Sequence, residues 1–154
     1  MKKLNENILH FLENQGCVIV ASIDKNGFPH TSCKGIVKIE PRGRIYLFDA
    51  YQHQTYDNLI NNPRISITAI DEHRFSGFCL KGSASILFDA KKDPQLLKAW
   101  ETRITSRLTQ RLLKNIREEK GHPRHPEILL PKPEYLIVID VEEIIDLTPQ
   151  HLKS

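Results

Sequence analysis

Residues 17–35, CVIVASIDKNGFPHTSCKG, decide the fold. Cys17–Ile23 is short, rich in β-branched residues and bounded by turn residues, which is typical of a buried strand. The Asn26-Gly27 pair that follows is the strongest short-range signal for a β-hairpin. His30–Glu40 then resumes as a second strand whose later part alternates apolar and polar residues. The stretch therefore predicts an antiparallel hairpin.

Further strands are expected on both sides of this hairpin. They cover residues 45–49, 64–70, 78–88 and 135–141, with a bulge or bend at Gly82. Helices are expected over residues 4–15, over residues 55–62 with Thr55 as N-cap, and from Asp93-Pro94 towards Lys120-Gly121. Residues 121–133 carry four prolines and are expected to be irregular, and the tail after Pro149 to be frayed.

The element order favours a mainly β (α+β) fold. It indicates a small barrel of about six antiparallel strands with an N-terminal helix, a short helix after the third strand and a long helix before the last. Tight turns argue against alternating βαβ units. The length of 154 residues suits one domain over 1–154, with a core at 16–148 and a tail at 149–154.

Composition excludes several classes of protein. The net charge of +3 is too mild to imply nucleic acid or an anionic membrane, and 40% hydrophobic with 27% charged residues excludes disorder. No apolar run is long enough for a transmembrane helix, and polar residues interrupt any signal peptide. Three cysteines without a CxxC pattern fit a reducing compartment. We therefore expect a cytoplasmic protein.

Two polar segments are candidate sites. At Ala50–Asn58 a strand ends and a helix starts, and a helix N-terminus attracts anions, with Gln54 and Thr55 as added donors. Plain N-capping is the alternative. On the second strand Ser32 and Lys34 share one face and suit a phosphate or a polarised carbonyl, unless this is a solvent-facing edge strand. Cys33, on the other face, is expected to be a buried small residue, or redox-active if a flavin lies beside it.

These segments carry a resemblance. The order GFPHTSCKG (27–35), RIYLFDAYQHQTYDNLINNPRISI (44–67) and FCLKGSASIL (78–87) resembles the FMN-binding split-barrel family related to pyridoxamine 5′-phosphate oxidase. The resemblance is good over 16–88 and loose elsewhere. It implies an FMN-binding split barrel and a homodimer with the flavin near the subunit interface. The cofactor-binding residues that it implies are Ser32, Cys33 and Lys34 along the flavin, Phe48, Asp49 and Ala50 at the ring edge, and Gln54 and Thr55 at the phosphate.

The resemblance implies a flavin-dependent oxidoreductase with an unknown small-molecule substrate or a donor such as NAD(P)H. Lys34 is the candidate for raising the flavin potential. Gln54 departs from the family, in which Lys or Arg is commoner at that position. Tyr135 onward carries no cation for a phosphorylated substrate, which argues against pyridoxamine 5′-phosphate oxidase activity itself. A non-catalytic flavin binder, electron-transfer protein or sensor is the alternative, and a deazaflavin or haem could occupy the same pocket.

The long helix is basic. Residues 98–117 hold six Lys or Arg and one Glu, and Arg103, Arg107, Arg111 and Lys114 follow one stripe. This stripe indicates either a solvated face or an anionic ligand, with nucleic acid the least favoured partner. His122 and His125 resemble half of a metal site, but without a third ligand in pattern no metal site is predicted. No catalytic residue is predicted either, because a flavin supplies its own chemistry.

Overall fold

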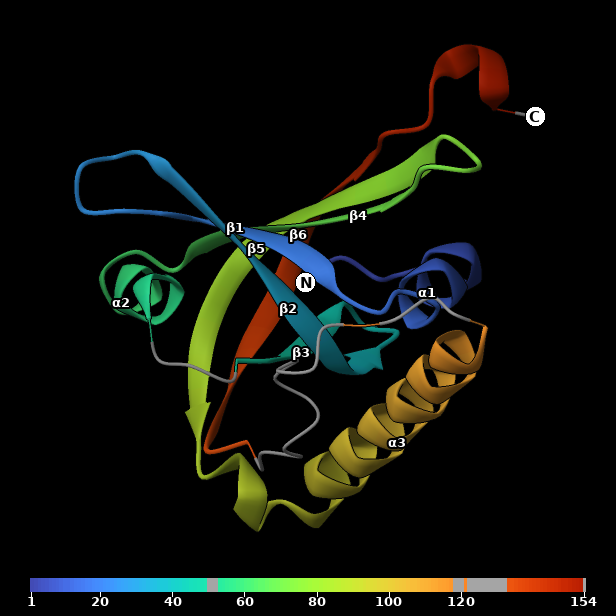
Figure 1. Cartoon of the computed structure of the whole chain (residues 1–154). Helices are drawn as coiled ribbons and strands as arrows, with labels where there is room; N and C mark the ends of the chain where they lie inside the picture. The colour runs from blue at the N-terminus through green and yellow to red at the C-terminus, as the bar shows by residue number, and fades with distance from the viewer. Residues whose placement is uncertain (50–52, 118–120, 122–132, 154) are drawn as a thin grey trace.

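The computed structural model describes residues 1–49, 53–117, 121 and 133–153. Antiparallel strands close into a barrel in the order β1-β2-β3-β6-β5-β4 (Figure 1). The strands are β1 (Val18–Ile23), β2 (Pro29–Glu40), β3 (Arg44–Phe48), β4 (Arg64–Asp71), β5 (Ser76–Phe88) and β6 (Tyr135–Asp146). The predicted fold class is thus confirmed, and β6 extends five residues beyond the predicted Val141.

The hairpin between β1 and β2 forms as predicted. The Asp24 carboxylate accepts the backbone N–H groups of Asn26 and Phe28 at 2.8 and 2.9 Å, and Gly27 adopts a φ of +83°. Few side chains tolerate this left-handed backbone, so Asn-Gly suits the turn. The predicted irregularity at Gly82 is also present, because the β5–β6 register shifts between Lys81 and Gly82. A Cβ at Gly82 would overlap the backbone of Asp140, which explains the need for glycine.

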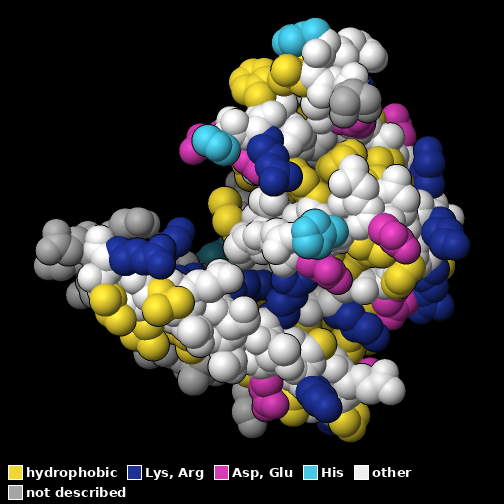
Figure 2. Space-filling model, turned by 90° about the vertical axis from the view of Figure 1, so that its right-hand side faces the viewer, with side chains coloured by type: hydrophobic (Ala, Val, Ile, Leu, Met, Phe, Trp, Pro, Cys, Tyr) yellow, Lys and Arg dark blue, Asp and Glu magenta, His cyan; other side chains and the backbone are white. Residues whose placement is uncertain are grey.

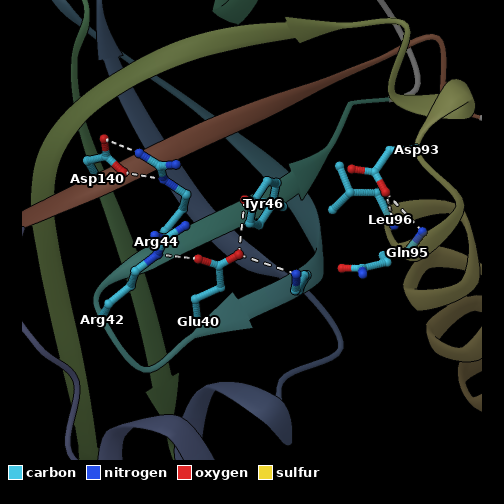
Figure 3. A network of polar contacts seen from close by, with 9 residues as sticks. Glu40, Arg42, Arg44, Tyr46, Asp93, Gln95, Leu96 and Asp140 are labelled. Carbon is cyan, nitrogen blue, oxygen red and sulfur yellow. Dashed lines mark hydrogen bonds and ion pairs between the residues drawn. The ribbon is translucent and has the colours of Figure 1, made fainter.

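Among the described residues, three α-helices pack on the barrel. They are α1 (Glu6–Glu13), α2 (Gln54–Asn61) and α3 (Pro94–Ile116). Asn5 caps α1 through the N–H of Ile8, and Asp93 caps α3 through the N–H groups of Gln95 and Leu96 (Figure 3). The Asp93-Pro94 start is confirmed.

The predicted N-cap of α2 is wrong. His53 is the N-cap residue, and Thr55 lies inside the first turn, where its side chain is buried. Its hydroxyl instead bonds to the Ser32 hydroxyl at 2.9 Å. The tail also differs from the prediction, since Gln150–Leu152 forms a 3-10 turn (η3) and Lys153 pairs with Asp146. Most of the segment 121–133, and with it His122 and His125, lies outside the described residues.

Two apolar clusters hold the fold together. The first fills the barrel and includes Val18, Val20 and Ile36, with Leu12 of α1 closing one side. The second lies outside the barrel, where Trp100 and Ile104 of α3 pack on β2, β3 and β6. A short 3-10 turn, η1 (Ala90–Lys92), leads from β5 into α3. Trp100 and Ile104 are therefore core residues, and they fix α3 along the outside of the barrel (Figure 1).

The β2–β3 hairpin is tied by a polar network (Figure 3). Glu40 accepts from Arg42 and from the Tyr46 hydroxyl, and Arg44 forms two bonds to Asp140 of β6. Burial alone would raise the pKa of Glu40, but the bonds from Arg42, Lys38 and Tyr46 outweigh it and lower the pKa. None of the described helices is both long and apolar enough to cross a membrane.

Candidate functional site

A cleft of about 830 Å³ lies between the second half of α3 and the strands β1, β2 and β4. In Figure 2, Lys and Arg side chains (dark blue) lie in the hollow between the body of the molecule and the part that projects at the left of the view. The lining residues are Gln15, Gly16, Cys17, Ile19, Cys33, Lys34, Gly35, Phe48, Asp49, Thr68, Ala69, Ile70, Arg107, Gln110, Arg111 and Lys114. The volume lies within the range of small-molecule sites.

One wall of the cleft is the outer face of the sheet. Ile19 pairs directly with Cys33 on one side and with Thr68 on the other, so these three side chains form a row across β2, β1 and β4. Cys33 is exposed, as are Ile19 and Ile70. The expectation of a buried Cys33 is wrong, because the face opposite Ser32 and Lys34 is the outside of the barrel. This wall is largely apolar and flat.

The other wall is the basic face of α3. Arg107 donates to the backbone carbonyl of Ile36, beside the irregularity in the β2–β3 register. Its guanidinium lies over Gly35, where a Cβ would stand 2.5 Å from the Arg107 Nη1 atom. Arg111 and Lys114 continue along the same wall. The predicted stripe is therefore not an entirely solvated helix face.

Arg103, the first residue of the stripe, lies outside the cleft. It donates to the backbone carbonyl of Glu13 at 2.7 Å, at the C-terminal end of α1. Burial, and then the charge of Arg107, lower the pKa of the Arg103 guanidinium. Arg103 thus lies near enough to Arg107 for the two charges to interact.

The inner end of the cleft holds a buried ion pair. Lys34 and Asp49 are in contact, with side chains 11% and 2% exposed. The second Asp49 oxygen accepts the Tyr135 hydroxyl at 2.7 Å. Lys34 therefore does not stand on a solvent-facing edge strand. β2 is paired on both sides, and Lys34 shares the inward face with its partner Val18.

A second polar cluster joins α2 to the barrel. Ser32 bonds to Thr55, while the Gln54 amide donates to Asn58, which donates to Ser22. Ser32 and Lys34 do share one face, as predicted, since their partners Val20 and Val18 both point into the barrel. The Ser32 and Thr55 hydroxyls are thus bonded to each other, and the Gln54 amide is bonded to another residue of α2.

The structure divides the predicted cofactor residues into two sets. Cys33, Lys34, Phe48 and Asp49 line the cleft, whereas Ser32, Gln54 and Thr55 do not. Ala50 lies outside the described residues. Within the described part of the chain, no three His, Cys, Asp or Glu side chains gather as a metal site would need.

Sequence reasoning missed several residues of the site. Ile19 and Thr68 come from strands that were predicted, but their adjacency to Cys33 depends on strand order. No local pattern links Tyr135 to Asp49, to which it donates a hydrogen bond. The spacing of Arg107, Arg111 and Lys114 was the one available signal, and it did not say which surface the helix would face.

Comparison with known proteins identifies the family. The sequence profile described as pyridoxamine 5′-phosphate oxidase matches residues 4–145, which is most of the chain. The chain belongs to this family. The predicted relationship is thereby confirmed. No curated protein matches the chain in sequence.

Solved structures share the fold at low sequence identity. HupZ of Group A Streptococcus is 19% identical, with a TM-score of 0.64 and 94% of each chain covered. A Clostridium acetobutylicum protein related to general stress protein 26, described as of the pyridoxinephosphate oxidase family, is 17% identical with a TM-score of 0.60, covering 97% of this chain and 100% of its own. A protein named F420 reductase is 15% identical with a TM-score of 0.60, covering 92% and 98%.

Proposed function

We propose that this protein is a flavoprotein that binds FMN in the cleft between α3 and the sheet. The proposal rests on one observation, namely that the two walls of the cleft differ in chemistry and face each other. A flat apolar wall with Ile19 and Cys33 faces a basic wall with Arg107 and Arg111. FMN has the matching parts, a planar ring system and an anionic phosphate. Membership of the family supports the same ligand.

The residues present fit FMN. Phe48 and the sheet wall with Ile19 and Cys33 offer apolar contact to the ring. Lys34 lies at the cleft, but its charge is offset by Asp49. Cations of α3 line the same cleft, and a positive charge near the ring stabilises a reduced anionic flavin. When bound, the flavin supplies hydride and electron transfer through its own ring.

We further propose that the activity is a flavin-dependent oxidoreduction in the cytoplasm with NAD(P)H or another small molecule as donor. The open side of the cleft suits completion by a second copy of the chain, as the family resemblance implies. The exposed Ile19 and Ile70 at its edge support such a homodimer. Steady turnover of NAD(P)H with an acceptor distinguishes an enzyme from a non-catalytic flavin binder or sensor.

A blocking substitution tests the location. Cys33→Trp fills the cleft from the sheet wall and should abolish FMN binding, measured by quenching of flavin fluorescence. Thr31→Trp is the matched control, because Thr31 is exposed on the same strand and face but does not line the cleft. Equal loss in both variants, or loss in neither, contradicts the proposed location.

Titrations of the wild-type protein with F420 and with haem test the alternative ligands. Tight binding of F420 or haem, together with no binding of FMN, contradicts FMN as the cofactor.

A further inference from the structure

We propose that the Lys34 ammonium binds a carbonyl oxygen of a ligand in the cleft, and that Asp49 and Tyr135 are positioning residues that hold Lys34 for this contact. The inference rests on the proposed function, since it assigns one contact within the same site. The sequence left two ligands open for the face shared by Ser32 and Lys34, a phosphate and a polarised carbonyl, and the inference selects the carbonyl.

Lys34 has hydrogen-bond donors to spare. An ammonium carries three N–H groups, and among the described residues Lys34 bonds only to Asp49. The Lys34 side chain is 11% exposed and lines the cleft. Because a buried donor without an acceptor is costly, an acceptor supplied from the cleft would stabilise the remaining N–H groups.

The charge at this end of the cleft favours a neutral acceptor. Lys34 and Asp49 carry opposite charges and are in contact, so the pair adds no net charge. An anion that approached Lys34 would also approach the Asp49 carboxylate, and the repulsion would offset the attraction. A carbonyl oxygen accepts the same hydrogen bond without bringing a full negative charge. The pair therefore suits a carbonyl better than a phosphate.

Tyr135 holds the second oxygen of the Asp49 carboxylate. The Asp49 Oδ1 atom accepts from Lys34 and the Oδ2 atom accepts from the Tyr135 hydroxyl at 2.7 Å, so both oxygens are occupied. Burial, and then the bond to Asp49, raise the pKa of Tyr135, so its hydroxyl stays a donor at neutral pH. The Tyr135 ring meets the Tyr56 ring of α2 edge to face, with centroids 5.2 Å apart. The carboxylate that orients Lys34 is thus fixed from β6 and α2.

The surroundings suit a flat ligand that carries carbonyl groups. Phe48, Ile19 and Cys33 line the same cleft and offer it a largely apolar surface. A flavin ring system carries carbonyl groups, and so does a quinone, which is one class of acceptor for a reduced flavin. Two probes separate these sources. Riboflavin has the ring without the phosphate, and menadione is a quinone that can be titrated into the FMN-loaded protein.

The variants remove the ammonium without leaving a lone charge. Lys34→Gln/Asp49→Asn replaces the pair by uncharged side chains of similar size. Lys38→Gln/Glu40→Gln is the matched control, because it does the same to an ion pair on the same strand that does not line the cleft. Tyr135→Phe keeps both charges of the Lys34 pair and removes only the bond to Asp49. Melting temperatures check that each variant is folded.

If Lys34 binds the flavin ring, the Kd of riboflavin should rise about tenfold in Lys34→Gln/Asp49→Asn and stay unchanged in the control. If Lys34 binds a second carbonyl compound, riboflavin binding is unaffected and menadione binding weakens by a similar factor.

The infrared carbonyl band of the bound ligand gives a readout that a merely structural role would not move. It should shift to higher wavenumber in Lys34→Gln/Asp49→Asn and in Tyr135→Phe, because a weakened or lost donor strengthens the C=O bond. If the double variant does not fold, the band in Tyr135→Phe decides.

Unchanged riboflavin and menadione affinities, or an unmoved carbonyl band in Tyr135→Phe, overturn the inference but leave the proposed function standing. Weaker binding of FMN with unchanged binding of riboflavin would place a phosphate at Lys34 and also contradict the inference. A wild-type protein that binds neither FMN nor riboflavin overturns the proposed function instead, and menadione binding to the flavin-free variants then tests the carbonyl contact by itself.

Discussion

The ammonium of Lys34 and the carboxylate of Asp49 form an ion pair at the inner end of the cleft, and Tyr135 donates its hydroxyl to the same carboxylate. Lys34 lies on β2, Asp49 directly follows β3, and Tyr135 begins β6. These contacts therefore join β2, which borders the proposed flavin site, to β6 and to the residue that follows β3. Its burial means that each charge depends on the other.

Removing one charge should be costly. Lys34→Met or Asp49→Asn leaves an uncompensated buried partner, so the free energy of unfolding should fall by about 3 kcal/mol in urea titrations. The double variant should lose less than the sum of the single losses. Lys92→Met breaks an exposed pair with Asp89 and should change little. Additive losses for Lys34 and Asp49 would show that the two side chains are not coupled.

The Tyr135 hydroxyl should make stability depend on alkaline pH. Burial, and then the bond to Asp49, raise the pKa of Tyr135 well above its ordinary value. The unfolded chain releases this proton near pH 10, whereas the folded protein keeps it, so the stabilisation is complete below about pH 10 and is lost as pH rises further. Tyr135→Phe should lose about 1 kcal/mol at neutral pH.

The pH dependence of the stability of Tyr135→Phe tests whether the raised pKa belongs to Tyr135. Above pH 10 the stability of Tyr135→Phe should fall less steeply than that of the wild type, as chemical denaturation at several pH values would show. Parallel profiles would contradict the assignment of the raised pKa to Tyr135.

Gly35→Ala should displace Arg107. The new Cβ would overlap the guanidinium, which would then lose its bond to the Ile36 carbonyl. We expect a loss of about 1 kcal/mol in the free energy of unfolding. In an Arg107→Ala background the same change should cost nothing, because the overlap is gone. An equal cost in both backgrounds would place the strain elsewhere.

Much of the fold could be predicted because its signals are local. Asn26-Gly27 specifies a hairpin turn and Asp93-Pro94 a helix start, and both are present. Alternation along β2 placed Ser32 and Lys34 on one face. It could not say which face was inside, since that depends on the closure of the barrel. Cys33 was therefore assigned to the wrong environment.

The composition of the site depended on contacts distant in sequence. Arg107 bonds to Ile36, 71 residues earlier, and Tyr135 to Asp49, 86 residues earlier. No local pattern encodes such contacts. At Thr55 the local pattern was misleading. It predicted an N-cap, but the Thr55 hydroxyl bonds to the hydroxyl of Ser32 on β2. The N-cap pattern failed at Thr55 because its hydroxyl has a hydrogen-bond partner that is distant in sequence.

The most direct test is gel filtration of the purified protein after incubation with an excess of FMN, followed by an absorbance spectrum of the protein peak. The account predicts a yellow peak with flavin absorbance that persists after separation from free FMN, and its loss in Cys33→Trp but not in Thr31→Trp. A colourless protein peak with all the FMN eluting separately would contradict the central claim that the cleft is a flavin site.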